Sequence, residues 1–242
     1  MSLIDRIKGF SLPAGEPAVR GVHGIKTTQR GEFRSSPNAR WVAFTAKEHV
    51  DATKSSFCWN AQMGTGLKSF NVTDLYENGQ GRLVVKKGPL KLRELRGSDV
   101  DRGELQRYLA YLAYCPTMIV NNPYLVMEST GPQTLRISDK SDHTGASVDL
   151  DVEDTGRISL ARAIRPMAVG RKIVMTPWSG RMSHFKEWQG LRIPYSMEAA
   201  WEPPEGTFTY IRIELTSVTI SAESRSPAGS LALQSGGQEL HS

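Results

Sequence analysis

Residues 175–210, MTPWSGRMSHFKEWQGLRIPYSMEAAWEPPEGTFTY, are the stretch that decides the fold of this 242-residue chain. They hold three of its five tryptophans, separated by Gly and Pro residues that favour turns. Residues 207–220 follow with alternating apolar and polar side chains. Such a pattern is typical of an antiparallel sheet that runs back and forth and packs aromatic side chains on one face. Residues 175–210 contain no recognisable catalytic motif.

The rest of the chain predicts more strands of the same kind, at residues 18–34, 40–46, 55–63, 67–76 and 81–87. In residues 57–63, Phe57, Trp59, Ala61 and Met63 share one face of the strand, because side chains alternate between faces. Asn78-Gly79 is a strong signal for a tight hairpin turn, since both central residues of such a turn need positive φ. The fold class expected is therefore mainly β, a strongly curved antiparallel sheet or half-barrel.

One main helix is predicted near residues 101–115. Asp101 and Glu104 have the spacing of a capping box, apolar residues follow at helical intervals, and Pro116 ends the helix. We expect this helix to cover the open side of the sheet.

A hairpin with a defined register is predicted around Gly156. The register places Val152 opposite Ile158, Leu150 opposite Leu160, and Glu153 beside Arg157 on the polar side. Further strands are expected at residues 171–175, 186–193, 196–201 and 207–220.

Composition indicates one ordinary globular domain, with 39% hydrophobic and 23% charged residues. We expect an N-terminal extension over residues 1–16, a β-sheet domain over 17–220 and a flexible tail over 221–242, which is rich in Ser, Gly and Ala. No apolar run approaches the roughly 18 residues that would span a bilayer. Charges near the start argue against a secretory signal. The sequence as it stands indicates a cytoplasmic protein, unless a leader or anchor was removed.

The net charge of +5 is modest, and an acidic segment from Asp139 to Asp154 separates two basic regions. Nucleic-acid binding is therefore not expected. Cys58 and Cys115 show no metal-binding spacing, and we expect both to be reduced residues that fill space.

Two stretches together resemble a family of uncharacterised bacterial proteins. These are RGEFRSSPNARWVAFTAKEHVDATKSSFCWNAQM, from Arg30, and TPWSGRMSHFKEWQGLRIP, from Thr176. The order of strands, helix and strands also resembles the lipoprotein-localisation-factor architecture. That resemblance implies a half-open curved sheet, closed by helices around an apolar concavity that can hold an acyl chain or similar ligand.

We therefore expect a non-catalytic binding protein for a lipid-like or other hydrophobic small molecule, with no cofactor. A wall of aromatic and apolar side chains would line the site, although core packing is the simpler interpretation of each residue taken alone. The candidate ligand-binding residues are Trp41, Phe57, Trp59, Tyr108, Leu112, Trp178, Trp201 and Tyr210.

The alternative is an enzyme of unknown reaction, such as a hydrolase, that uses polar residues of the segment 176–194. His184 and Glu187 could act as a general acid–base pair beside Arg181, although a structural pair of Arg181 with Glu187 is the simpler interpretation. Cys58 with His49 is a conceivable nucleophile–base pair.

The sequence also holds a dense group of possible metal ligands, Asp139, Asp142 and His143. Turns are rich in Asp for backbone reasons, so we expect no metal site there.

Overall fold

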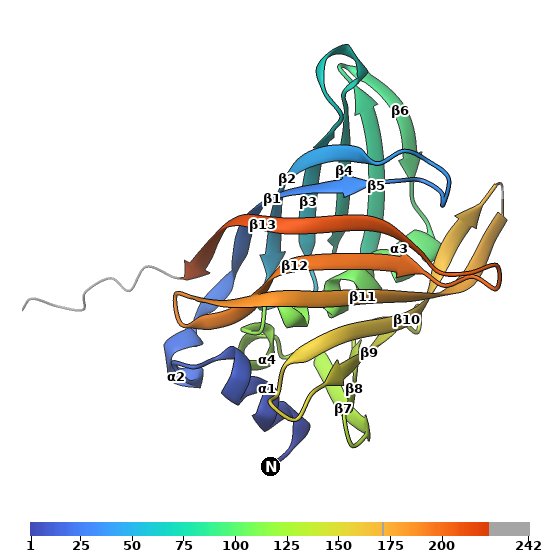
Figure 1. The fold of residues 1–242 in the computed structure, drawn as a ribbon. Helices are drawn as coiled ribbons and strands as arrows, with labels where there is room; N and C mark the ends of the chain where they lie inside the picture. The colour runs from blue at the N-terminus through green and yellow to red at the C-terminus, as the bar shows by residue number, and fades with distance from the viewer. Residues whose placement is uncertain (171, 223–242) are drawn as a thin grey trace, which may run out of the picture.

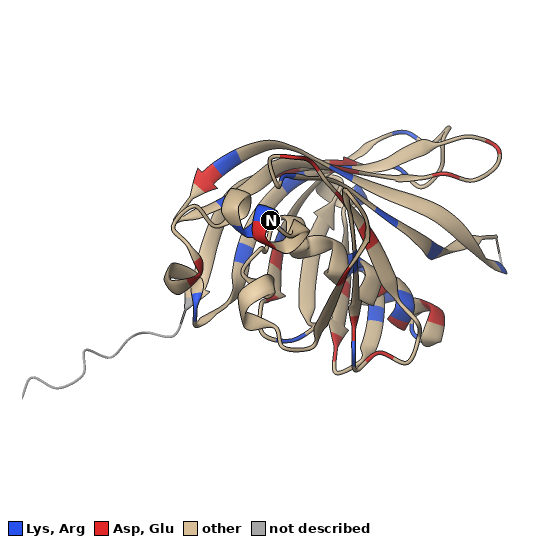
Figure 2. Cartoon of the chain, turned by 90° about the horizontal axis from the view of Figure 1, so that it is seen from below, with Lys and Arg blue, Asp and Glu red and all other residues tan. Residues whose placement is uncertain are grey.

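The computed structural model describes residues 1–170 and 172–222, whose strands form one 13-stranded antiparallel sheet (Figure 1). Its strand order is β6-β5-β4-β3-β2-β1-β13-β12-β11-β10-β9-β8-β7. Strands β1 to β6 and β7 to β13 therefore each pair with their neighbours in sequence, β1 also pairs with β13, and β6 and β7 are the two edge strands of the sheet. The sheet curls strongly, and the helices lie on its concave side (Figures 1 and 2).

The strands are β1 (Val22–Phe33), β2 (Val42–Asp51), β3 (Phe57–Met63), β4 (Phe70–Glu77), β5 (Gln80–Lys87), β6 (Leu90–Leu95), β7 (Leu125–Gly131), β8 (Thr134–Asp139), β9 (Ser147–Val152), β10 (Ile158–Val169), β11 (Lys172–Trp188), β12 (Leu191–Trp201) and β13 (Phe208–Ala222). The helices are α1 (Leu3–Ser11), α2 (Glu16–Val19), α3 (Ser98–Ala110) and α4 (Met118–Asn121), with short 3-10 turns at Gly66–Lys68 and Tyr111–Ala113.

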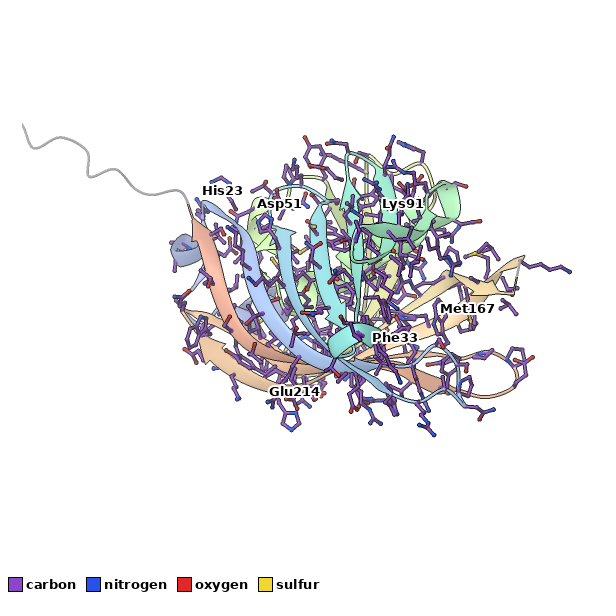
Figure 3. The ribbon with its side chains drawn as sticks, turned by 90° about the horizontal axis from the view of Figure 1, so that it is seen from above. His23, Phe33, Asp51, Lys91, Met167 and Glu214 are labelled. Carbon is purple, nitrogen blue, oxygen red and sulfur yellow. The ribbon has the colours of Figure 1, made fainter. Side chains whose placement is uncertain are left out.

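Because the strands alternate in direction, their connections fall on two opposite edges of the sheet. One edge carries the connections β1–β2, β3–β4, β5–β6, β10–β11 and β12–β13, and we call it the mouth edge. The other, the helix edge, carries β2–β3, β4–β5, β9–β10 and β11–β12. In Figure 3 the two ends of β1, His23 and Phe33, mark the helix edge and the mouth edge respectively.

Helix α3 packs against β4 and β5 on one arm of the sheet and against β9 and β10 on the other. Tyr108, Leu109 and Leu112 on this segment are fully buried, so the helix fills the space between the arms. Helix α1 closes the helix edge, with Ile7 buried and its backbone against Gly156. A Cβ at Gly156 would lie 2.0 Å from the carbonyl oxygen of Arg6, and its φ of +89° also favours glycine.

The predicted curved antiparallel half-barrel is confirmed by this strand order. Asn78 and Gly79 both have positive φ, as the predicted hairpin turn requires. The sequence did not predict α1 or β6. The predicted strand over 186–193 is wrong, because Gln189 and Gly190 form the β11–β12 turn with positive φ.

The predicted break between residues 175 and 186 is also wrong, because β11 runs through it without interruption. Gly180 does not mark a turn. It lies beneath the indole of Trp178, where an added Cβ would come within 2.9 Å of the ring.

The predicted hairpin register is correct at its turn and wrong further along. Ile158 does pair with Val152, and Arg157 forms an ion pair of 2.6 Å with Glu153. A bulge after Ile158 then shifts the register, so that Leu150 lies opposite Ala161 instead of Leu160.

The main helix begins earlier than predicted, at Ser98. Asp101 does not form a capping box. Its Oδ1 accepts a hydrogen bond of 2.7 Å from the backbone N–H of Gly81 and so ties α3 to β5. Cys58 and Cys115 are both free thiols. From residue 223 onward, the predicted tail lies outside the described residues.

Replacing Leu109 tests whether α3 holds the two arms of the sheet together. Leu109→Ala leaves a cavity at a fully buried position, so it should lower the free energy of unfolding by about 2–5 kcal/mol in urea denaturation. Leu90→Ala, at a position that is 63% exposed, should change it by less than about 0.5 kcal/mol. Equal losses in the two variants would contradict this role of α3.

Candidate functional site

Two rows of apolar side chains cross the concave face near the mouth edge. Residues directly opposite each other on neighbouring strands form each row, because paired residues share a face. The first row joins Phe70, Met63, Phe44, Gly31, Ile213 and Met197. The second joins Val42, Phe33, Ile211 and Ala199. Most of these side chains are half-buried, whereas the concave residues under the helices are fully buried. We call the two rows the mouth rows.

An aromatic wall continues the mouth rows onto β11, β12 and β13. Trp201 stacks on Tyr210 with ring centroids 5.8 Å apart, and Phe33 meets Tyr210 edge-on at 6.3 Å. The indole N–H of Trp178 donates a hydrogen bond of 3.1 Å to the Tyr210 hydroxyl. The rings are thus fixed relative to one another, while Trp201 and Tyr210 remain half-buried.

Arg165 of β10 joins the aromatic wall to the interior. Its guanidinium lies 4.7 Å from the ring centroid of Trp178 and 6.0 Å from that of Trp201, within reach of cation–π attraction. One terminal nitrogen donates a 2.7 Å hydrogen bond to the carbonyl oxygen of Gly103 on α3. The buried Nε has no hydrogen-bond partner among the described residues.

A buried ionic cluster lies deeper in the concavity, where α3 meets β2 and β4. Glu48 is its centre and is only 5% exposed. One oxygen of its carboxylate accepts hydrogen bonds from Gln29 (2.7 Å) and from the hydroxyl of Tyr114; the other accepts one of 2.6 Å from Tyr111. Gln29 in turn accepts a 2.9 Å bond from the indole of Trp59. The Glu48 charge is therefore well solvated by protein groups.

Arg107 of α3 is the cation of this cluster. It donates a 2.6 Å hydrogen bond to Asp74 and lies 3.5 Å from Glu48. Its guanidinium also stacks over Trp59 and Phe57, at 4.9 and 5.1 Å from the ring centroids. Burial nevertheless raises the pKa of Asp74, because desolvation outweighs the attraction of Arg107.

Glu104 is the acidic residue of the cluster whose negative charge would be least stabilised by its neighbours. Burial raises its pKa to about 8 and the neighbouring Asp74 adds to the rise, although Arg107 and Arg165 oppose it. Its Oε2 atom is buried without a hydrogen-bond partner in the described part of the chain. At neutral pH the side chain therefore carries a proton and can donate a hydrogen bond.

The candidate ligand-binding residues fall into three places. Phe57, Trp59, Tyr108 and Leu112 are buried under α3, and the Tyr108 hydroxyl donates to the carbonyl oxygen of Asp51 at 2.9 Å. Trp178, Trp201 and Tyr210 form the aromatic wall. Trp41 lies apart from both groups, with the guanidinium groups of Arg34 and Arg212 each 4.7 Å from its ring centroid.

The polar residues proposed for catalysis all lie exposed on β11. Arg181 pairs across the sheet with Glu198, and Glu187 forms its ion pair with Arg192 at 3.3 Å. His184 has a φ of +53° and lies near Ser183, with its Nδ1 3.3 Å from the hydroxyl oxygen. The strand does not bring the three side chains to a common point.

Asp139 and Asp142 serve the turn that follows β8. Asp139 accepts hydrogen bonds from the backbone N–H and hydroxyl of Ser141, and Asp142 accepts them from Thr144 and Ala146. Among the described residues, no group of three or more His, Cys, Asp and Glu side chains could hold a metal ion.

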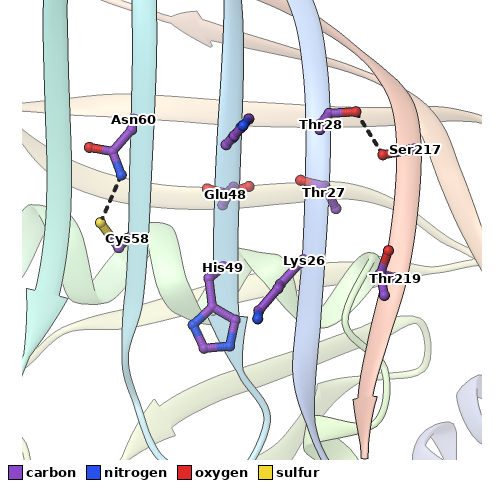
Figure 4. Close-up of a pocket in the computed structure, with 10 residues that line it drawn as sticks. Lys26, Thr27, Thr28, Glu48, His49, Cys58, Asn60, Ser217 and Thr219 are labelled. Carbon is purple, nitrogen blue, oxygen red and sulfur yellow. Dashed lines mark hydrogen bonds between the residues drawn. The ribbon is translucent and has the colours of Figure 1, made fainter.

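Two open hollows, of about 470 and 590 Å³, lie over the convex face of β1, β2 and β3. His49 and Cys58 sit directly opposite each other in the smaller hollow (Figure 4). The sulfur of Cys58 accepts a hydrogen bond of 3.2 Å from Asn60. The lining is polar and includes Lys26 and Lys47.

Sequence reasoning missed the ionic cluster, although a signal for it was present. Glu48 interrupts the inward-facing series Phe44, Ala46 and Val50, and Asp74 likewise follows Val72 on the inward face of β4. A carboxylate at a core position of an alternating strand requires a buried partner. Nothing in the local sequence identifies Arg107 as that partner.

The curled antiparallel sheet with helices in its concavity is a half-barrel. The chain belongs to a family of unknown function, DUF6544, whose model matches residues 9–213. The predicted membership of an uncharacterised family is thereby confirmed. No curated protein matches the chain in sequence.

Three solved structures are similar to this chain. A DUF1329 family protein from Desulfovibrio piger has a TM-score of 0.50 at 10% identity, covering 89% of this chain and 95% of its own. A LolA superfamily protein, NE2245 from Nitrosomonas europaea, has a TM-score of 0.49 at 9% identity, with 90% and 91% covered. An outer membrane lipoprotein-sorting protein domain from Vibrio parahaemolyticus has a TM-score of 0.39 at 11% identity, with 86% and 90% covered. At these identities the likeness concerns the fold alone.

The raised pKa of Glu104 predicts a loss of stability as pH rises. In the unfolded chain this carboxyl loses its proton near its ordinary pKa of 4.5, whereas in the folded protein it keeps it to about 8. Between these values the folded state binds more protons, so stability falls with increasing pH. Glu104→Gln cannot ionise and should be more stable than the parent at pH 9, by about 3–5 kcal/mol, and nearly equal to it at pH 5.

Urea denaturation of the parent and variant from pH 5 to 9 measures this difference. The control is Glu128→Gln on the exposed side of β7, which should follow the parent curve. If Glu104→Gln and the parent lost stability in parallel, Glu104 would not be the group responsible.

Proposed function

We propose that this protein binds a lipid-like or other hydrophobic small molecule between the mouth rows and the aromatic wall. The observation that carries the proposal is the incomplete burial of a continuous apolar surface on the concave face. Water-exposed apolar surface on the inside of a curved sheet is the usual setting for a hydrophobic ligand. The half-barrel fold supports the same assignment at the level of analogy.

The chemistry of the surface indicates how such a ligand would lie. An acyl or aromatic group would contact Phe33, Trp201 and Tyr210, whose rings present large apolar areas without losing much conformational freedom. A polar end group would lie toward Arg165, where the Nε hydrogen has no partner in the described residues. The fully buried region under α3 is filled by protein side chains and would form the floor of the site.

No helix within the described residues is both long and apolar enough to cross a membrane.

Blocking the mouth rows tests the proposal. Ala199 faces the concavity and Ala200, its neighbour on β12, faces outward, since the two pair with Gly180 and Ser179 respectively. Ala199→Trp should weaken binding of cis-parinaric acid by about tenfold or more, because the ring would occupy the space of the ligand. Ala200→Trp adds the same bulk on the other face and should bind like the parent.

Energy transfer from the tryptophans to the polyene probe, fitted as a separate titration for each protein because each variant has one more tryptophan than the parent, gives the affinity. Circular dichroism checks that both variants are folded. Native mass spectrometry and organic extraction of the purified parent would identify a co-purified ligand. Failure of the parent to bind the probe, or equal affinities in the two folded variants, would refute binding at the mouth rows.

A further inference from the structure

The β10–β11 hairpin extends beyond the rest of the sheet. Strand β10 pairs with β9 only as far as Arg162, and β11 pairs with β12 only from Trp178 onward. The two strands pair with each other out to Val169 and Lys172. The end of the hairpin is therefore a two-stranded ribbon with no strand beside either edge, and near its base the carbonyl oxygen of Ile164 accepts a 3.0 Å hydrogen bond from Gln106 of α3. It projects from the body in all three views, with Met167 on it in Figure 3.

This ribbon is apolar on both of its faces. Ile164, Ile173 and Met175 lie on one face, and Val169 and Val174 lie on the other. All five are between 42% and 52% exposed. A strand of a water-soluble sheet usually alternates apolar and polar residues, with one face turned to the core. Toward the tip neither face has a core to cover it, whereas at the base Arg165 and Thr176, on the same face as Val174, are buried.

The hairpin is also basic. From Thr155 to Lys186 inclusive the sequence has no Asp or Glu, whereas it has seven Lys and Arg residues. Lys172, next to the tip, is exposed. Figure 2 shows Lys and Arg positions and no acidic position along the projecting arm. Charge of this sign attracts the anionic headgroups of a membrane surface.

Two other connections of the mouth edge, β3–β4 and β5–β6, have the same character, whereas the β12–β13 connection carries the exposed Glu202 and Glu205. Leu67 in the β3–β4 connection is 96% exposed, and Leu90 and Leu92 at the β5–β6 hairpin are 63% and 53% exposed. The stretch from Asn78 to Arg93 contains five Lys and Arg residues and no acidic one. Thus eight of the eleven exposed large hydrophobic residues in the described part of the chain lie toward the mouth edge. The three elsewhere are Met1, Tyr124 and Trp188.

We propose that the β10–β11 hairpin inserts into the surface of an anionic lipid bilayer. Insertion would remove both faces of the ribbon from water, whereas a protein docked on one face would leave the other exposed. The free edges of the ribbon carry backbone groups that need water or headgroups as partners, which keeps the insertion shallow. Pro166 and Pro177 reduce the number of such unpaired N–H groups.

This membrane contact is independent of ligand binding, because it rests on the outer hairpin and not on the mouth rows. The two sites are nevertheless on the same side of the molecule, since the β10–β11 connection belongs to the mouth edge. Bilayer contact through the hairpin would therefore bring the opening of the concavity toward the lipid.

Vesicle flotation of the full 242-residue chain tests the proposal. The chain should float with vesicles of phosphatidylcholine and phosphatidylglycerol, bind vesicles of phosphatidylcholine alone more weakly, and be released from the anionic vesicles by salt. The double substitution Val169→Ser and Ile173→Ser should lower the affinity by about tenfold or more, because it removes apolar area from both faces. Lys172→Glu should weaken binding to the anionic vesicles.

The control is Trp188→Ser, which removes an exposed large apolar side chain at the opposite, helix edge of the sheet and should leave binding unchanged. Urea denaturation of each variant shows whether it is as stable as the parent. The proposal is overturned if the parent does not float with anionic vesicles, or if the double variant and the control lose binding equally. It is also overturned if the parent does not bind vesicles and the hairpin substitutions instead disrupt a dimer that sedimentation detects in the parent.

Discussion

The packing of α3 between the two arms of the curled sheet is the constraint on which the rest of the structure depends. An antiparallel sheet of this size twists, and its two ends come to face each other across the concave side. The apolar surface there must be covered, and α3 contacts β4 and β5 on one arm and β9 and β10 on the other. Tyr108 and Leu109 of α3, and Leu112 in the turn that follows, are fully buried. The same helix positions Glu104 and Arg107 where they meet the carboxylates of β2 and β4. The packing of α3 against the sheet therefore stabilises the fold and also positions the residues of the ionic cluster.

The polar cluster beneath this helix is unusual for the centre of a core. Isolated carboxylates are costly to bury, and here the hydrogen bonds from Gln29, Tyr111 and Tyr114 offset that cost for Glu48. Glu104 has less compensation and keeps its proton instead. The concave face thus has two chemically different regions. The buried ionic cluster, with its hydrogen-bonded Glu48 carboxylate, lies below α3, and an apolar surface that is only partly covered lies toward the mouth edge.

Sequence analysis selected some residues that lie together in this site and others that do not belong to it. Trp178, Trp201 and Tyr210 were selected as aromatic residues of alternating strands, and they do lie together. Trp41 was selected on the same grounds, but it immediately precedes β2, one position out of phase with the inward-facing Val42, and its ring packs with Arg34 and Arg212 instead. Glu104 was assigned to a helix cap, because its spacing from Asp101 matched a local motif. That motif holds no information about burial by distant strands.

The sequence by itself determined the antiparallel, curved-sheet architecture, because alternation of apolar residues and Gly-, Pro- and Asn-rich turns are local properties with a fixed period. It also determined the Asn78-Gly79 turn and the ion pair between Glu153 and Arg157, whose partners are close in the chain. Only the tertiary structure decided that β1 pairs with β13, that Arg107 meets Glu48 and Asp74, and that the tip of β10 and β11 has no neighbour. Each of these depends on how far the sheet curls, and curvature is a sum of many small twists that no single segment encodes.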